Sequence, residues 1–433
     1  MALRVMTAPQ AEPTLNGTRG SYNSGDAYCV LWDNRNDAVT RKLSVTDVDV
    51  QGKRVFVRVD FNVPLTDCGT LGDDTRIRAA LPTIRYLLDH GAAVILASHL
   101  GRPKGTEQES LRLAPVGERL AELLDSKVLL APDSVGPDVA QMVGRLEPGQ
   151  VLLLENLRFH AEEERNDPGF ARQLANGADL YVNDAFGAAH RSHASTVGIT
   201  EYLPSVSGLL MQRELDELGS VLRDPKRPLA ALIGGAKISS KVGVLTHLLG
   251  VADEFLVGGG MANTLLKAQG LNVGASLVED DKVQVARDFL ERAKEAGRAV
   301  HLPVDVMVAE RIAVDAAVKV VPVDHIPDGW AIVDIGPCSI EVFTVVLSAA
   351  GTVIWNGPMG VFEIPAFATG TRELALGLAE SRARTIVGGG DSVAAVEQTG
   401  VADRIAHIST GGGAALEFLE GRELPGIAAL SDA

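Results

Sequence analysis

The chain contains 433 residues, long enough for two or three domains, and its 46% hydrophobic and 22% charged residues are typical of a soluble globular protein. Its 40 basic and 56 acidic residues give a formal net charge of -16, which argues against binding nucleic acid or an anionic membrane through a broad basic surface. The three cysteines, Cys29, Cys68 and Cys338, are too few and too scattered for a disulfide framework or a zinc site, and they fit a reducing cytoplasm.

Residues 1–41 differ in composition from the rest of the chain. The stretch "TAPQAEPTLNGTRGSYNSGDAY" has no apolar periodicity and many turn formers, and the N-terminus lacks the apolar core of a signal peptide. We expect either a disordered leader or sequence upstream of the true start codon, and assign it no function. Ordered structure is predicted to begin near Lys42, in "KLSVTDVDVQGKRVFVRVD".

Short apolar runs that end in polar or glycine-rich residues recur along the chain. In the first half they are "RVFVRV", "AAVILA", "VLLL" and "DLYV"; in the second they are "LAALI", "EFLV", "TVIW", "RTIV" and "IAHI". Continuous apolar runs that alternate with helical patterns indicate buried parallel strands covered by helices on both faces. The sequence therefore predicts an α/β protein with two doubly wound, Rossmann-like domains. The uncharged stretch Val342 to Phe362 is interpreted as an apolar element, a strand and a turn rather than a membrane span.

One helical pattern separates the two series of strands. Leu210, Leu215, Leu218 and Leu222 lie on one face, and prolines end the pattern. We expect an N-terminal domain over residues 42–207, an interdomain helix over 208–224 and a C-terminal domain over 225–408. A last segment, 409–433, is expected to return toward the first domain.

Basic and polar residues follow the strands of the first half. Ligands bind beyond the carboxyl ends of parallel strands, so these positions indicate what each half binds. They are Asp60, Asn62, His99, Arg102, Asn156 and Arg158, with Arg76 and Arg191 in nearby segments. Arginines gathered in an acidic protein favour a clamp for a compact anion, although any one of them alone would be read as a surface residue.

Glycines follow the strands of the second half, in triplets at 258–260, 388–390 and 411–413. Such turns let a backbone approach phosphates closely, so this half is predicted to bind a nucleotide. Asp391 would then adjoin the phosphates, a conflict that a magnesium ion would resolve. In "GGAKISSK", Lys237 and Lys241 would share one helix face if a helix has begun there.

A small anion on one side and a nucleotide with a metal on the other indicate phosphoryl transfer between two ligands. In several ordered segments the chain from about Lys42 onward resembles the phosphoglycerate kinase family: "RVDFNVP", "TRIRAALPTI", "SHLGRPKG", "LLENLRFH", "NDAFGAAHRSHAS", "IGGAKISSK", "WNGPMGVFE", "GGGDS" and "STGGGAALEFLEG". The resemblance implies a hinge-bending cytoplasmic kinase of glycolysis, which transfers a phosphoryl group between 1,3-bisphosphoglycerate and ADP to give 3-phosphoglycerate and MgATP. We expect a monomer.

The resemblance also implies roles for residues that match the family's motifs. The glycerate would be bound by residues of the first domain: Asp60, Phe61, Asn62, Arg76, His99, Leu100, Gly101, Arg102, Arg158 and Arg191. The nucleotide would be bound by residues of the second: Lys237, Lys241, Asn356, Glu363, Gly389, Gly390, Asp391 and Ser392. Asp391 would hold Mg²⁺, and Arg76 and Lys237 would act on the moving phosphoryl group in an in-line transfer. Which lysine follows that group stays open, and Lys237 is favoured.

Some residues depart from the family or invite a plainer interpretation. Ser392 stands where threonine is commoner, but it keeps the hydroxyl; Ala188 stands where the family often has threonine. His190 and His193 are equally consistent with the anion site and with packing. Trp330 and Trp355 are expected in the core, and "HAEEER", residues 160–165, on a solvated acidic face. The remaining histidines, His90, His247, His301, His325 and His407, are interpreted as structural or surface residues.

Two other functional classes share part of this sequence pattern. A nicotinamide-dependent dehydrogenase shares glycine-rich turns, but its dinucleotide fingerprint is absent and the arginines would be unexplained. A catalytically inactive binding protein of the same fold would keep the core, and the presence of Arg76, Lys237 and Asp391 argues against it.

Overall fold

The structure, a computed structural model, describes residues 41–66 and 69–433. The predicted leader lies outside the described residues except for Arg41. The 3₁₀ turn Val45–Asp47 is the first described helical element, and Ser44 caps it in a capping box with Asp47.

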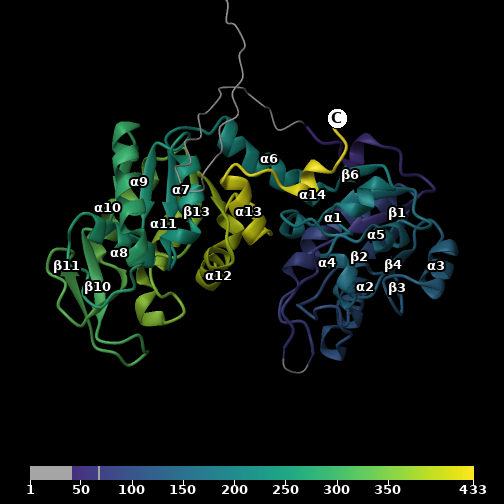
Figure 1. Cartoon of the computed structure of the whole chain (residues 1–433), viewed down its shortest axis with the longest axis horizontal. Coiled ribbons are helices and arrows are strands. Elements are labelled where there is room, and N and C mark those ends of the chain that lie inside the picture. The colour runs from purple at the N-terminus through teal and green to yellow at the C-terminus, as the bar shows by residue number, and fades with distance from the viewer. Residues whose placement is uncertain (1–40, 67–68) are drawn as a thin grey trace, which may run out of the picture. The chain divides into compact units, whose positions relative to one another are not determined.

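The first of two large sheets has six parallel strands in the order β3-β4-β2-β1-β5-β6 (Figure 1). The strands are β1 (Arg54–Arg58), β2 (Ala93–Ala97), β3 (Val128–Leu130), β4 (Val151–Leu153), β5 (Leu180–Asn183) and β6 (Ser205–Ser207). The helices between them are α1 (Thr75–Asp89), α2 (Ala114–Leu124), α3 (Pro137–Gly144), α4 (Ala161–Glu164) and α5 (Pro168–Leu174).

Alternate residues of β1 belong to different cores, because successive side chains of a strand point to opposite faces. Val55 and Val57 pack with residues of α1 and α2, whereas Phe56 packs with residues of α3 and α5. Both faces of the sheet are therefore covered, as the continuous apolar runs predict.

The second large sheet repeats this architecture, with six parallel strands in the order β15-β14-β13-β7-β8-β9. These are β7 (Leu229–Ile233), β8 (Glu254–Val257), β9 (Ala299–His301), β13 (Thr352–Asn356), β14 (Arg384–Val387) and β15 (His407–Ile408). One face packs against α7 (Val242–Leu248), α8 (Gly259–Ala268), α9 (Val283–Glu295) and α13 (Gly412–Leu419). The other packs against α10 (Pro337–Ala349), α11 (Thr369–Glu380) and α12 (Gly390–Thr399). Two doubly wound domains are thus confirmed.

A third, antiparallel sheet has the order β11-β10-β12 and was not anticipated from the sequence. Its strands are β10 (Asp305–Ala309), β11 (Val318–Pro322) and β12 (Ala331–Ile335). Trp330 lies beside this sheet, half-buried, with the Lys319 ammonium 3.9 Å from the centre of its ring. The expectation of a core position is confirmed for Trp355, which is fully buried in β13. Trp330 is only partly buried and packs against the small core of Val306, Val308 and Ile326.

Helix α6 (Leu209–Arg223) joins the two large sheets, as its apolar pattern predicts. Its N-cap residue, Gly208, has no side chain, and Oδ1 of Asp184 instead accepts hydrogen bonds from the N–H groups of Leu210 (2.9 Å) and Met211 (3.2 Å). Burial raises the pKa of Asp184 to about 6. A cap supplied by the end of β5 thus fixes where the connecting helix begins.

The end of the chain contacts the domain of the first sheet. After α14 (Pro425–Ala428), the N–H of Leu43 donates to the carbonyl of Ser431 at 2.9 Å, and Leu430 is buried in the same core as Phe56. Asn183 donates from Nδ2 to the carbonyl of Gly426 at 3.0 Å. Among the described residues, no helix is long and apolar enough to cross a membrane.

Candidate active site

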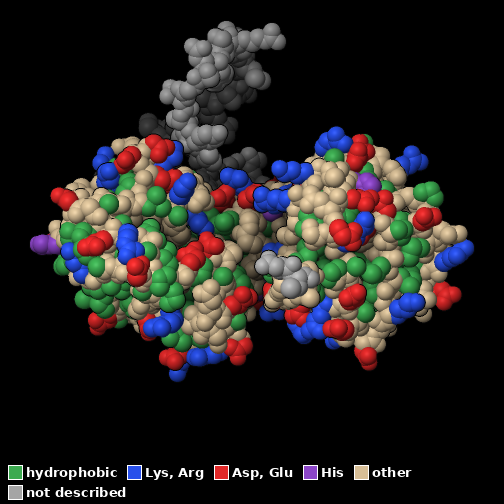
Figure 2. Space-filling view, turned by 90° about the horizontal axis from the view of Figure 1, so that it is seen from below, with side chains coloured by type: hydrophobic (Ala, Val, Ile, Leu, Met, Phe, Trp, Pro, Cys, Tyr) green, Lys and Arg blue, Asp and Glu red, His purple; other side chains and the backbone are tan. Residues whose placement is uncertain are grey.

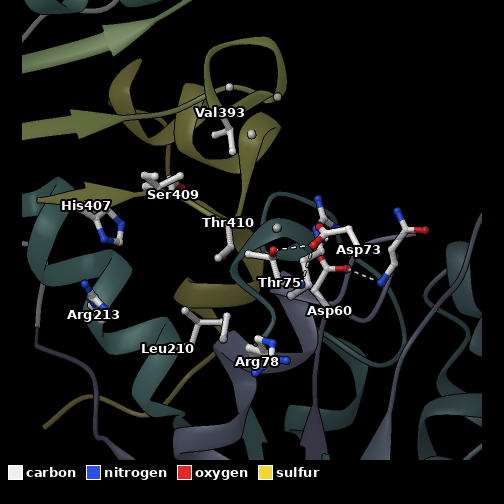
Figure 3. Close-up of a pocket in the computed structure, with 18 of the residues that line it drawn as sticks. Asp60, Asp73, Thr75, Arg78, Leu210, Arg213, Val393, His407, Ser409 and Thr410 are labelled. Carbon is white, nitrogen blue, oxygen red and sulfur yellow. Dashed lines mark hydrogen bonds and ion pairs between the residues drawn. The ribbon is translucent and has the colours of Figure 1, made fainter. Parts of the chain in front are cut away.

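A cleft of about 1180 Å³ opens at the carboxyl ends of β1 and β2 (Figure 3). Figure 3 shows Asp60, Asp73 and Thr75 grouped together, with Thr410 facing them. Of the predicted site residues, the cleft is lined by Asp60, Asn62, Arg76, His99, Arg191, Gly389 and Gly390. It is also lined by His190, Ser409 and residues of the "TGGG" turn at 410–413.

Asp60 and Asn62, just after β1, contact α1 and the loop after β2. Nη1 of Arg76 lies 2.9 Å from Oδ2 of Asp60, which draws the first turn of α1 onto the end of β1. Oδ1 of Asn62 accepts the N–H of Gly101 at 2.8 Å, where the glycine has φ = +63°. The N–H of Phe61 donates to Ser98 Oγ at 2.8 Å. These bonds hold the "DFN" and "SHLGR" segments together.

Gly187 is required where the two halves of the cleft approach each other. A Cβ atom there would lie 2.4 Å from Oδ2 of Asp60 and 3.5 Å from the carbonyl oxygen of Thr410. A side chain at position 187 would therefore displace the Asp60 carboxylate from its position beside Arg76.

Arg158 and Asn156 are buried beneath this surface. Asn156 accepts the N–H of Leu100 at 3.2 Å and donates from Nδ2 to the Leu100 carbonyl at 2.8 Å. Nη1 of Arg158 donates to the carbonyl of Gly101 at 2.8 Å, and its Nε lies 3.2 Å from Glu164. Burial, followed by the charge of Arg191, lowers the pKa of Arg158 to about 10. Both residues support the "SHLGR" loop, and neither is among the cleft-lining residues.

Two histidines flank Arg191 and differ in their surroundings. His190 lines the cleft, and the Nε of Arg191 donates to its Nε2 at 3.1 Å. His193 is buried, and burial followed by the Arg58 charge lowers its pKa to about 3. The packing interpretation therefore suits His193, and the cleft interpretation suits His190.

The expectation of a fully solvated "HAEEER" face is wrong at Glu163, whose side chain is completely buried. Its carboxylate accepts the hydroxyl of Ser195 at 2.6 Å and the N–H of Ser195 at 3.0 Å. Burial raises the pKa of Glu163. Its partner lies 32 residues further along the chain, so the local charge run gave no sign of it.

The lysines of "GGAKISSK" do not share a helix face, which corrects the spacing argument. Lys237 precedes the 3₁₀ turn Ile238–Ser240, and α7 begins only after Lys241. Lys237 is exposed, whereas Lys241 is half-buried and donates from Nζ to Oδ1 of Asn356. Burial lowers the pKa of Lys241 to about 8, while the nearby carboxylates of Asp391 and Glu420 act in the opposite direction.

Asn356 links the strands that carry the glycine turns. It is buried at the end of β13, and its Nδ2 donates to the carbonyl of Gly388 at 2.8 Å. Gly389 has φ = +95°, and a Cβ there would lie 2.9 Å from that Nδ2. The buried hydroxyl of Ser392 accepts the N–H of Gly357 at 2.5 Å, so the hydroxyl kept at this position has a structural partner.

Asp391 occupies the first turn of α12, exposed and beside Lys241. Among the described residues, no three His, Cys, Asp or Glu side chains are grouped to hold a metal ion by themselves. Mg²⁺ is commonly held by one or two carboxylates together with substrate phosphates, so a single carboxylate at a helix N-terminus fits such a site.

Not all predicted residues meet in one cavity. Several of the predicted site residues lie outside the cleft lining: Lys237, Lys241, Asn356, Glu363, Asp391, Ser392, Arg102 and Arg158. Arg102 and Glu363 are exposed.

Sequence reasoning overlooked Arg58, the last residue of β1. An arginine within the apolar run "RVFVRV" was itself a signal, because arginine is rarely buried without a partner.

On the face shown in Figure 2, Lys and Arg side chains alternate with Asp and Glu side chains over both domains. In the cleft, by contrast, Arg76, Arg191 and His99 are grouped at the strand ends of the first sheet.

Comparisons with known proteins agree on one family. The family model described as phosphoglycerate kinase matches residues 45–422. Phosphoglycerate kinase of Moorella thermoacetica is 58% identical over 391 residues, covering 90% of this chain and 99% of the relative. That of Synechococcus elongatus is 59% identical over 394 residues, covering 90% and 98%.

Solved structures give the same result. Phosphoglycerate kinase from Coxiella burnetii is similar with a TM-score of 0.82 at 42% identity, covering 90% of this chain and 98% of that one. The enzyme from Pyrococcus horikoshii has a TM-score of 0.77 at 34% identity, with the same coverage.

Proposed function

This chain belongs to the phosphoglycerate kinase family, and on that premise we propose how its residues divide the work of phosphoryl transfer. The enzyme is a phosphotransferase of glycolysis with a carboxyl group as acceptor. It reversibly transfers a phosphoryl group between 1,3-bisphosphoglycerate and ADP, which gives 3-phosphoglycerate and ATP.

The glycerate is proposed to bind at the strand ends of the first domain. The observation that carries this proposal is one cleft in which Asn62, Arg76, His99 and Arg191 meet the glycine turns of the second domain. Guanidinium groups bind carboxylate and phosphate through paired hydrogen bonds, which suits a ligand with both groups. Asp60 holds Arg76 in place, and Phe61, Leu100, Gly101, Arg102 and Arg158 complete or support the site.

The nucleotide is proposed to bind at the glycine turns of the second domain. Lys241 and the N-terminus of α12, at Gly389 and Gly390, face its phosphates, with Ser392 holding the turn. Glu363 contacts the nucleoside. Asn356, which is buried, acts mainly through Lys241 and Gly388.

Magnesium is proposed as the companion of the nucleotide, with Asp391 as its protein ligand. When bound, Mg²⁺ neutralises phosphate charge and orients the phosphate oxygens. The helix dipole stabilises the Asp391 carboxylate in the first turn of α12, and Mg²⁺ would offset its repulsion from the nucleotide phosphates.

The transfer is proposed to be in line, and the protein's part is positioning, charge neutralisation and water exclusion. A carboxylate acceptor is already ionised at neutral pH, so no general base is needed. Arg76 approaches the moving phosphoryl group from the first domain and the exposed Lys237 from the second. Closure of the domains brings these charges together.

The enzyme is further proposed to act as a cytoplasmic monomer. The direct test of the function is ATP formation from ADP and 1,3-bisphosphoglycerate, measured with and without Mg²⁺. We expect product only with the metal. No product under either condition would favour the inactive binding protein.

A further inference from the structure

Arg58 is a charged residue inside a β-strand, and its guanidinium is almost entirely withdrawn from solvent, at 1% exposure. Its three nitrogens each have a different partner. Nε donates to Ser195 Oγ at 2.8 Å, Nη1 donates to the carbonyl of Val59, and Nη2 lies 3.1 Å from Nδ1 of His99. A buried charge is costly unless it is both compensated and hydrogen-bonded, so this arrangement calls for a counter-charge.

Glu163 supplies that charge through the hydroxyl of Ser195. The hydroxyl accepts from Arg58 and donates to Glu163 Oε1 at 2.6 Å, which uses its single proton. The N–H of Ser195 donates to the other carboxylate oxygen at 3.0 Å. Arg58, Ser195 and Glu163 therefore form one fully buried row with fixed donors and acceptors.

His99 contacts the end of the row that Arg58 forms, through its Nδ1. A guanidinium has five N–H donors and no acceptor, so the His99 Nδ1 that faces it must present a lone pair. A neutral imidazole with a lone pair on Nδ1 carries its proton on Nε2. His99 lines the cleft, and Nε2 has no hydrogen-bond partner among residues 41–66 and 69–433.

The surroundings of His99 favour the neutral ring. Burial is the largest cause that holds its pKa well below the ordinary value, followed by the charges of Arg58, Arg158, Arg191 and Arg76. A protonated ring would place an N–H against the N–H of Arg58.

We propose that Arg58, oriented by Ser195 and Glu163, is a positioning residue that fixes His99 as the neutral Nε2–H tautomer. His99 then meets the anionic substrate as a directed hydrogen-bond donor and not as a cation. The inference rests on the proposed binding of glycerate in this cleft, and it assigns Ser195 and Glu163 an indirect part in that binding.

The first test is the nitrogen NMR spectrum of the full chain labelled with ¹⁵N-histidine, with the His99 signals assigned from a His99→Gln sample. Near neutral pH we expect an unprotonated Nδ1 and a protonated Nε2. An Nδ1–H tautomer or a doubly protonated ring would overturn the proposal. This measurement uses the unaltered row, so it does not depend on whether a variant folds.

The second test is Ser195→Ala, which removes the hydroxyl between Arg58 and Glu163. We expect the KM for 3-phosphoglycerate to rise about tenfold, the effect of weakening one hydrogen bond to a charged group. The KM for ATP should stay the same, and the His99 signals should move toward a mixture of tautomers. Ser126→Ala, at an exposed position between α2 and β3, is the matched control.

The outcomes separate the two proposals. If His99→Gln leaves the KM for 3-phosphoglycerate unchanged, the role of His99 in binding is wrong, whatever its tautomer. If His99→Gln weakens binding while Ser195→Ala alters neither the tautomer nor the KM, the positioning row is wrong and the binding site stands.

Discussion

Nη1 of Arg76 lies 2.9 Å from Oδ2 of Asp60, within the cleft and on the first turn of α1. The ion pair leaves other donors of the guanidinium available, since a guanidinium carries five. If Arg76 binds the substrate as proposed, this ion pair orients its guanidinium in advance and reduces the reorganisation that binding requires.

Replacing Arg76 with alanine is expected to lower kcat/KM strongly. Loss of one preorganised donor to transition-state charge costs roughly 2.7–4 kcal/mol, or about 10²–10³-fold in rate. The measurement is the coupled assay for 3-phosphoglycerate turnover. Arg85→Ala, an exposed position on the same helix outside the cleft, should behave as the parent enzyme. Unchanged turnover in Arg76→Ala would show that the assignment is wrong.

The affinity for ADP is expected to fall as pH rises through about 8. Burial lowers the pKa of Lys241 to about 8, so its amine becomes neutral above that value and no longer attracts phosphates. Titration calorimetry between about pH 7 and pH 9.5 should show this decline, given that an unperturbed lysine stays charged until about 10.4. The Lys241→Met variant should bind ADP more weakly, and its affinity for ADP should no longer decline with pH. If the decline persists in this variant, another group causes the pH dependence.

Asp391→Asn is expected to raise the Mg²⁺ concentration that half-saturates the reaction, with a smaller effect on the KM for 3-phosphoglycerate. The substitution keeps the size of the side chain and removes the charge that suits the cation. Magnesium titrations of activity make the comparison, and Asp403→Asn, exposed beyond the end of α12, is the control. If the parent enzyme, Asp391→Asn and Asp403→Asn are half-saturated at the same Mg²⁺ concentration, Asp391 is not the metal ligand.

The cap on α6 makes stability depend on pH in a predictable direction. Burial raises the pKa of Asp184 to about 6, above the value of about 3.9 in an unfolded chain. Between these values the folded state binds the extra proton, so this group makes the free energy of unfolding fall as pH rises. Asp184→Asn keeps an acceptor for Leu210 and Met211 and should remove that contribution, as chemical denaturation at pH 4.5 and pH 7 can measure.

Asp184→Ala separates the cap from the charge. It removes the acceptor altogether, and loss of a helix cap costs about 1 kcal/mol. We expect Asp184→Ala to be less stable than Asp184→Asn at both pH values. Equal stability would mean that the two hydrogen bonds at the start of α6 contribute nothing measurable.

The sequence predicted nine of the twelve parallel strands of the two large sheets, because a strand buried on both faces is a continuous apolar run. It missed β3, β6 and β9, which are only three residues long. It did not predict the sheet of β10, β11 and β12, since Val318 and Val320 are exposed and no polar motif marks the end of β11. Partly exposed strands such as β11 and β12 lack the continuous buried run that made the other strands recognisable.

The sequence predicted site residues that adjoin a strand or helix end, and it missed residues whose partners lie far away along the chain. Asp60 and Asn62 lie two and four residues after the end of β1, and Gly389 and Gly390 are the N-cap and the first residue of α12, so their places follow from the fold. The pairing of Glu163 with Ser195 joins segments that have no common local signal. The two lysines were misplaced because a four-residue spacing does not reveal where α7 begins.

The described chain starts and finishes in the same domain, with Leu43 bonded to Ser431. It therefore crosses to the second domain and back, once along α6 and once along the segment after β15. These crossings contact each other, because Glu214 of α6 accepts the N–H of Thr410 at 2.7 Å and lies 2.8 Å from His407. Two connections joined by hydrogen bonds leave fewer relative motions of the two domains than a single connection would. The route of the backbone itself thus restricts the directions from which the two substrates can be brought together.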